Sequence, residues 1–295
     1  MQTAYIYSAS RVATLGQFLL NRTDIERLLV ATPGADLISA LKETYLGPYL
    51  IRAGDENMPG AIELTLIDAK QIILSIAPAG SVFRFLWVQY DVHNLRVLAK
   101  ARAAGLEYAA CRRFFSHRGN YDPEQLADAA ERGALDHLET GWQAAFEQAV
   151  RYAMSGELDR VDGALDVALF ATYRRVAAEA NDAFITCYVA AVIDAYNLRT
   201  RLRVLAHPPV ADQPNFVAGG TLPMERMETA EQVAESFELL RPGFFTGALA
   251  YYTDAGHTTQ LDARCDEYLL SLSAEASVDL FSAASLVRYY LACRQ

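Results

Sequence analysis

The sequence has few of the patterns that mark metal, redox or nucleotide-binding sites. Its 295 residues include four cysteines and five histidines. No C-x-x-C, H-x-x-x-H or H-E-x-x-H arrangement brings these residues together. A Walker-type glycine loop, a G-x-G-x-x-G segment and a G-x-S-x-G elbow are also missing. We therefore expect no metal, no cofactor and no catalytic centre, and scattered cysteines are typical of small core residues in a reducing compartment.

Long apolar runs are missing as well. The most apolar segment, residues 183–193, ends at Asp194, well short of the roughly 20 residues that span a bilayer. The first 20 residues lack a basic leading region and carry Arg11 inside their apolar part, unlike a signal peptide. We expect a soluble protein of a reducing cytoplasm, and any association with a membrane must go through partners.

Positive charge is scarce overall but locally concentrated. The net charge of −10 disfavours nucleic-acid binding, which needs a basic footprint. Basic residues are concentrated over 96–118 and 199–203. Two interpretations of these basic segments remain open: they complement helix dipoles at helix C-termini, or they face an acidic partner or an anionic surface. The candidate partner-facing residues are Arg102, Arg112, Arg113, Arg118, Arg201 and Arg203.

The apolar spacing predicts an all-α protein. Apolar residues recur at intervals of three to four, and no alternating pattern supports a sheet. Residues 83–90 are rich in aromatics typical of strands, but we interpret them as buried helix because no hairpin partner exists. Start signals lie at Thr23, Asp122 and Thr229, and a loop is expected over 207–220. The expected helices include 5–20, 37–50, 62–76, 82–101, 135–154, 158–180, 183–205, 261–272 and 278–293.

An Asp-x-x-Asn-Leu-Arg motif occurs twice, 103 positions apart, beginning at residues 91 and 194. Acidic residues that follow an apolar one, Glu63, Asp162 and Asp262, recur at intervals of about 100, and such periodicity indicates repeated units. Gly119-Asn120-Tyr121 corresponds to Gly220-Thr221-Leu222. We predict three helical units, 1–104, 105–206 and 207–295. A third motif would fall near or beyond Gln295, so the last unit is expected to be incomplete at its C-terminus.

The motif places polar side chains on one helical face. Asp91 and Asn94 are three residues apart, as are Asp194 and Asn197, and share a face by helical spacing. Buried polar groups of this kind satisfy the backbone of a neighbouring loop. The alternative, a carboxylate acting as general base, needs a second titratable partner, and the linear sequence supplies none. The repeated structural motif comprises Asp91, Asn94, Arg96, Asp194, Asn197 and Arg199.

These features carry a family resemblance. The opening Tyr5-Ile6-Tyr7-Ser8-Ala9-Ser10-Arg11, the segment Leu41-Lys42-Glu43-Thr44-Tyr45 and the two motif helices resemble the C subunit of bacterial and archaeal V/A-type ATPases, a relative of the d subunit of eukaryotic V-ATPases. The resemblance implies a funnel-like, all-helical protein with three similar domains around a pseudo-threefold axis. It also implies a non-catalytic central-stalk protein, a socket between the D and F shaft subunits and the membrane rotor ring, in ATP-coupled proton or sodium transport. Such a protein is cytoplasmic and peripheral to the cell membrane.

Two other classes of protein remain as alternatives. An all-α enzyme of isoprenoid synthase type needs clustered aspartates to hold magnesium ions. Here Asp162 and Asp166, and likewise Asp262 and Asp266, are pairs four residues apart, but no Asp-Asp-x-x-Asp occurs. A helical scaffold with unrelated partners is the third possibility, although units of about 100 residues are long for a solenoid.

Overall fold

The computed structural model describes residues 5–54, 56–206, 216–223, 225, 227–256 and 258–295. Within these ranges the regular structure is helical and contains no strand, so the prediction of an all-α fold is confirmed. The elements are α1 (Ile6–Gly16), α2 (Arg22–Val30), α3 (Ala35–Lys42), α4 (Gly47–Ala53), α5 (Met58–Ile76), η1 (Gly80–Leu86), α6 (Val88–Ala103), α7 (Tyr108–Cys111), η2 (Arg112–Phe114), α8 (Pro123–Glu131), η3 (Leu135–His137), α9 (Trp142–Met154), α10 (Leu158–Ala180), α11 (Ala183–Ala206), α12 (Ala230–Leu240), α13 (Thr246–Ala255), α14 (Thr259–Ala276) and α15 (Ala284–Arg294).

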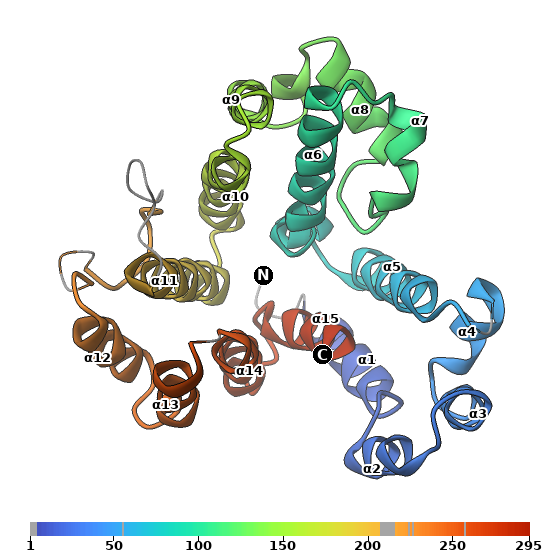
Figure 1. Ribbon diagram of the computed structural model, residues 1–295. Helices are drawn as coiled ribbons and strands as arrows, with labels where there is room; N and C mark the ends of the chain where they lie inside the picture. The colour runs from blue at the N-terminus through green and yellow to red at the C-terminus, as the bar shows by residue number, and fades with distance from the viewer. Residues whose placement is uncertain (1–4, 55, 207–215, 224, 226, 257) are drawn as a thin grey trace.

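The longer helices form a closed succession of neighbours. Helix α6 packs on α10, α10 on α11, α11 on α14, α14 on α15 and α15 on α5, while η1 joins α5 back to α6. Figure 1 shows these helices around the middle of the view, with the shorter helices outside them. The first helix, α1, packs against the last, α15, so the two ends of the described chain lie side by side.

One large hydrophobic core runs through this arrangement. It extends from Val12 in α1 to Leu291 in α15 and includes the fully buried Trp87, Trp142 and Tyr290. A much smaller second core, made of Leu41, Leu46, Leu50 and Ala61, lies under α2, α3 and α4. The helices α2, α3 and α4 therefore pack on this small core, separately from the main one.

The segment before α6 differs from the expected helix over 82–101. Residues 80–86 form the 3-10 helix η1, and α6 begins only at Val88. Phe83, Phe85 and Trp87 are almost completely buried. Because the consecutive residues 85–88 are all buried, this apolar run has no helical period that could distinguish a 3-10 turn from an α-helix.

Two other predicted helices are each divided. The expected 37–50 helix is α3 and α4, separated where the Thr44 hydroxyl donates to the carbonyl of Leu41 at 2.7 Å and accepts from the amide of Leu46 at 3.2 Å, in place of regular helical bonds. The expected 135–154 helix is η3 and α9, with Gly141 at a φ of 84° between them. Of the expected 207–220 loop, residues 207–215 lie outside the described part.

The capping predictions have mixed outcomes. Thr229 caps α12 in a capping box with Gln232, and Asp122 accepts from the amide of Glu124 at 2.9 Å, as expected. The predicted helix start at Thr23 is wrong, because Asn21 caps α2. The side chain of Asn21 accepts from the backbone N–H of Asp24, and the side chain of Asp24 accepts from the backbone N–H of Asn21. Both Asn21 and Thr23 are good capping residues, and the sequence did not separate them.

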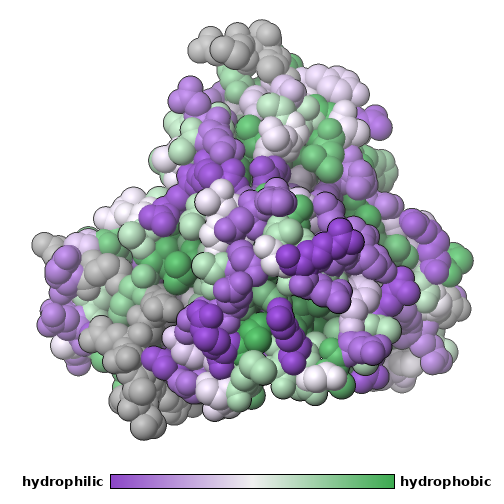
Figure 2. All heavy atoms as spheres, turned by 90° about the horizontal axis from the view of Figure 1, so that it is seen from above, coloured by the Kyte–Doolittle hydropathy of each residue, from purple (hydrophilic) through white to green (hydrophobic). Residues whose placement is uncertain are grey.

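The surface is mixed in character. Figure 2 shows polar and apolar side chains interspersed on the face seen there. None of the helices described combines the length and apolar composition needed to cross a membrane.

Candidate functional site

The first motif copy fixes a loop to α6. Asp91 is fully buried. Its Oδ2 accepts from the backbone N–H of Asn120 at 2.8 Å and from the Asn120 side-chain amide at 2.9 Å, and its Oδ1 accepts from the backbone N–H of Tyr121 at 3.0 Å. One turn later Asn94 donates to the carbonyl of Ser116 at 2.8 Å and accepts from the amide of Ser116 at 2.9 Å. These two side chains therefore satisfy the backbone of the loop over 116–121.

The second copy repeats this pattern on α11. The buried Asp194 accepts from the backbone N–H of Thr221 at 2.9 Å, from its hydroxyl at 2.7 Å and from the backbone N–H of Leu222 at 3.1 Å. Asn197 donates to the carbonyl of Val217 at 2.8 Å and accepts from its amide at 2.9 Å. We name each of these arrangements a helix–loop tie.

Each tie requires a glycine. A Cβ atom on Gly119 would lie 2.1 Å from Oδ1 of Asp91, and one on Gly220 would lie 2.0 Å from Oδ1 of Asp194. These distances are far inside van der Waals contact, so any side chain at either position would displace the carboxylate or the loop. The Gly-x-x correspondence noted in the sequence thus matches equivalent positions in the structure.

The motif arginines point away from the loops and reach the next pair of long helices. Arg96 of α6 forms ion pairs with Asp162, at 3.3 Å, and Asp166 of α10. Arg199 of α11 forms an ion pair with Asp262 of α14 at 3.0 Å. Each motif therefore holds a loop through its Asp and Asn and a following helix through its Arg.

Glu63, the first of the three acidic residues that recur at intervals of about 100, has a different kind of partner from Asp162 and Asp262. Glu63 of α5 forms an ion pair with Arg118 at 2.6 Å and accepts from the Ser116 hydroxyl at 2.9 Å and the His117 amide at 2.8 Å. These partners belong to the loop that Asp91 and Asn94 hold. Glu63 therefore extends the first tie and connects α5 to it.

Burial controls the electrostatics of the first tie. It raises the pKa of Asp91 to about 6, although the hydrogen bonds from Asn120 and Tyr121 and the charge of Lys70 lower it. Burial also lowers the pKa of Lys70, whose ammonium donates to the carbonyl of Gly119 and lies 5.4 Å from the centre of the Trp87 ring. Because Asp91 has no exposed surface and its oxygens are occupied, the arrangement favours a structural carboxylate over a general base.

Glu139 is a buried carboxylate that the sequence did not single out. Only 2% of it is exposed, and it forms ion pairs with Arg84 of η1 and Arg175 of α10. Tyr121 places its hydroxyl 3.2 Å from the Glu139 carboxylate and donates to the carbonyl of Leu138 at 2.9 Å. The first tie is thus connected to α10. No motif marked Glu139, because both arginines are distant in sequence.

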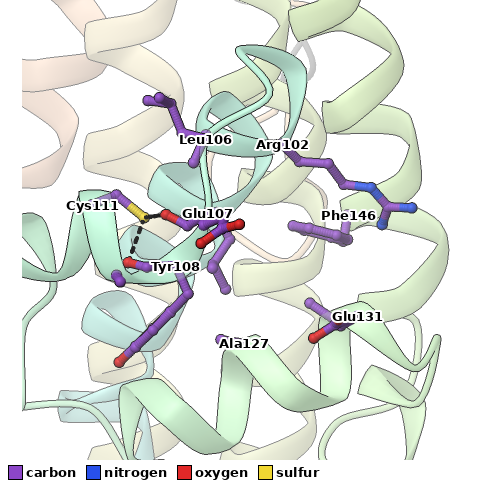
Figure 3. Close-up of a pocket in the computed structure, with 12 residues that line it drawn as sticks. Arg102, Leu106, Glu107, Tyr108, Cys111, Ala127, Glu131 and Phe146 are labelled. Atoms are coloured by element: carbon purple, nitrogen blue, oxygen red, sulfur yellow. Dashed lines mark hydrogen bonds between the residues drawn. The ribbon is translucent and has the colours of Figure 1, made fainter.

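The six predicted partner-facing arginines differ in their contacts within the chain. Most are engaged within the chain: Arg112 with Glu124, Arg118 with Glu63, Arg201 with the carbonyls of Met227 and Glu228, and Arg203 with Asp262 at 3.9 Å. Arg113 lies over the ring of Phe114 at 4.7 Å. Arg102 lines a groove at the end of α6, shown in Figure 3.

The acidic pairs considered as magnesium ligands are also occupied. Asp166 accepts from the hydroxyl of Tyr196 at 2.8 Å in addition to its pair with Arg96. Asp266 forms an ion pair with Arg294 at 3.0 Å. Across the described ranges, no group of three or more His, Cys, Asp or Glu residues is placed to hold a metal ion.

Long helices that pack in a closed succession, joined by two similar sets of buried polar contacts, define an all-α protein. The chain belongs to the family described as ATP synthase (C/AC39) subunit, which matches residues 9–295. It is similar to the C subunit of the A-type ATP synthase of Methanocaldococcus jannaschii, with 23% identity over 144 residues. That alignment covers 46% of this chain and 36% of the relative, little more than a third of the relative's length. The family resemblance inferred from the sequence is confirmed.

Proposed function

We propose that this chain is a non-catalytic central-stalk component of a V/A-type ATPase. In this role it is a socket between the D and F shaft subunits and the membrane rotor ring, and it transmits torque for ATP-coupled proton or sodium transport. Family membership supports a place in such a complex. In the cell we expect the chain on the cytoplasmic side, in contact with the membrane only through its partners.

The observation that best supports the role is the pair of helix–loop ties. A part that transmits torque must resist deformation, and fully satisfied buried polar groups hold elements in one arrangement. Asp91 and Asn94 hold one loop and Asp194 and Asn197 another with equivalent atoms. Arg96 and Arg199 then join successive helices. This work needs neither a nucleophile nor a metal.

We further propose that the chain is built from three similar units, 1–104, 105–206 and 207–295, around a pseudo-threefold axis. Supporting this division, the contacts from α6 to α10 and from α11 to α14 both use a motif arginine and an acidic residue of the next unit. The corresponding acidic residue of the first unit, Glu63, is bound instead by Arg118 of the loop at the start of the second unit.

The isoprenoid synthase alternative has less support. It would need Asp162, Asp166, Asp262 and Asp266 to be available for magnesium, whereas arginines of the same chain engage all four. The scaffold alternative predicts partners outside rotary ATPases. Binding experiments separate it from the proposed role.

The test is binding of the full chain to purified D–F shaft and to rotor rings in detergent. We expect the wild-type chain to bind both components and to join them into one assembly on size-exclusion chromatography. Binding to neither component would overturn the proposal. As a control for nonspecific charge effects, the experiment is repeated at high salt, where interactions between exposed charges are screened.

A further inference from the structure

A groove of about 680 Å³ lies at the end of α6. In Figure 1, the neighbouring helices α7, α8 and α9 lie in the outer part of the fold. Its walls come from α6, the residues after it, α7, α8 and α9 (Figure 3). No contact of the helix–loop ties uses it. The lining residues with small side chains are Ala101, Ala109, Ala127 and Ala130.

The floor of the groove is apolar and firmly held. Leu98, Ala130 and Phe146 are buried members of the main core, so the floor is present without a ligand. The thiol of Cys111 donates toward the carbonyl of Tyr108 at 3.2 Å, and Figure 3 shows it directed at the backbone. The groove therefore offers an apolar contact surface and no reactive sulfur.

Charged side chains without ion pairs surround this floor. Glu107, Glu131 and Arg102 all line the groove and are exposed. None of the three takes part in an ion pair with another described residue. The neighbouring Arg112 is paired with Glu124. The rim thus carries two carboxylates against one guanidinium, and it attracts a positively charged group.

One large apolar side chain is exposed at the edge of the groove. Leu106, which lines the groove, is 54% exposed. Single exposed apolar residues are ordinary on protein surfaces. Here Leu106 adjoins an apolar floor and alanine walls, which is the combination that accepts a helix in a groove.

We infer that this groove is the docking site for an amphipathic helix of a partner protein. Apolar side chains of that helix contact Phe146 and Leu98, and its lysine or arginine side chains meet Glu107 and Glu131. The alanines allow the two backbones to approach closely. The inference goes beyond the proposed rotor function, because it concerns the outside of the fold and requires neither the shaft nor the ring as the occupant.

The experiment places a photoreactive amino acid at Ala109, which is exposed and lines the groove, in the full chain expressed in cells that assemble the native complex. Cross-linked peptides are identified by mass spectrometry. The expected product is a peptide of another protein that carries basic residues beside an apolar helical stripe. Glu131→Lys should reduce its yield about tenfold, since reversal of a rim charge weakens association.

The matched control is Glu56→Lys, because Glu56 is also exposed and is distant in sequence from the residues that line the groove. It should leave the yield unchanged, and circular dichroism should show that both variants fold. A cross-link no stronger than that from the same amino acid at position 56 would overturn the inference. So would a product containing a lipid or a second copy of this chain, or a yield insensitive to Glu131→Lys. Binding to the shaft and ring is measured separately, so failure here leaves the rotor proposal intact.

Discussion

Gly119 and Asp91 approach each other so closely that a Cβ atom on the glycine would lie 2.1 Å from the carboxylate. Gly220 and Asp194 repeat this approach at 2.0 Å. The pairs come from loops and helices about 100 residues apart in the chain. Each tie therefore depends on the absence of a side chain as well as on the presence of hydrogen-bonding groups.

Substitution of either glycine by alanine should destabilise the protein. The added methyl group must displace a buried carboxylate that accepts three hydrogen bonds, and we expect Gly119→Ala and Gly220→Ala each to lower the free energy of unfolding by about 2–3 kcal/mol. Gly247→Ala, where a Cβ would meet nothing within 4 Å, is the control and should be neutral or slightly stabilising. Urea denaturation measures all three, and equal effects would contradict the close-approach argument.

The two asparagines should be equally important. Asn94→Ala leaves the amide and carbonyl of Ser116 without partners, and Asn197→Ala does the same at Val217. A buried unsatisfied polar group costs about 1–3 kcal/mol, so we expect losses of similar size at the two sites. Hydrogen exchange should show faster exchange of the Ser116 amide in the first variant and of the Val217 amide in the second. Exchange rates unchanged from wild type would be inconsistent with the ties.

The motif arginines should differ in energetic importance. The side chain of Asp166, partner of Arg96, is 14% exposed, whereas that of Asp262, partner of Arg199, is 38% exposed. Breaking a more buried pair leaves a carboxylate in a less polar environment, so Arg96→Gln should cost about 2 kcal/mol and Arg199→Gln about 0.5–1 kcal/mol. Double-mutant cycles with Asp166→Asn and Asp262→Asn measure the two couplings, and the reverse order would contradict the burial argument.

Burial of Asp91 predicts a pH dependence of stability. Its pKa in the folded chain is raised from 3.8 to about 6, so the folded state binds the proton more tightly than the unfolded state. The stabilisation from this proton is fully present below pH 4 and is lost as the pH rises through 6. The wild type should lose stability relative to Asp91→Asn over this window, by about 1.4 kcal/mol per pH unit at most.

The measurement is urea denaturation of both chains at steps between pH 4 and 7. The difference between their unfolding free energies should become less favourable to the wild type as the pH increases. Glu56→Gln, at an exposed position, serves as the control substitution. A difference independent of pH would show that Asp91 keeps the same protonation in the folded and unfolded chains.

Many of the helices could be predicted from the sequence, because a helix is marked by the spacing of its apolar residues and by the capping residue at its start. Helix α10 has the expected bounds, and α11 differs from its prediction by one residue. The repeated motif singled out Asp91, Asn94, Asp194 and Asn197, although the sequence does not show which residues they contact. The helix predictions succeeded because they depend on local sequence, and the motif could be found because it is repeated within the chain.

The features that could not be predicted depend on contacts between residues that are distant in the sequence. The sequence could not show that Arg118 would pair with Glu63, or that Glu139 would be buried between Arg84 and Arg175. For the same reason, it could not show which basic side chains contact acidic groups of the same chain, as Arg112 contacts Glu124. The 3-10 helix before α6 could not be predicted, because the run of consecutive buried residues over 85–88 carries no amphipathic period.

The central claim is that this chain connects shaft and ring in a rotary ATPase. The most direct measurement is electron cryomicroscopy of the native complex purified through a tag on this chain. The account predicts density for this fold between the D–F shaft and the rotor ring, in the same orientation to the shaft in every rotational state. A complex that lacks this chain, or that holds it in the stationary part, would contradict the account.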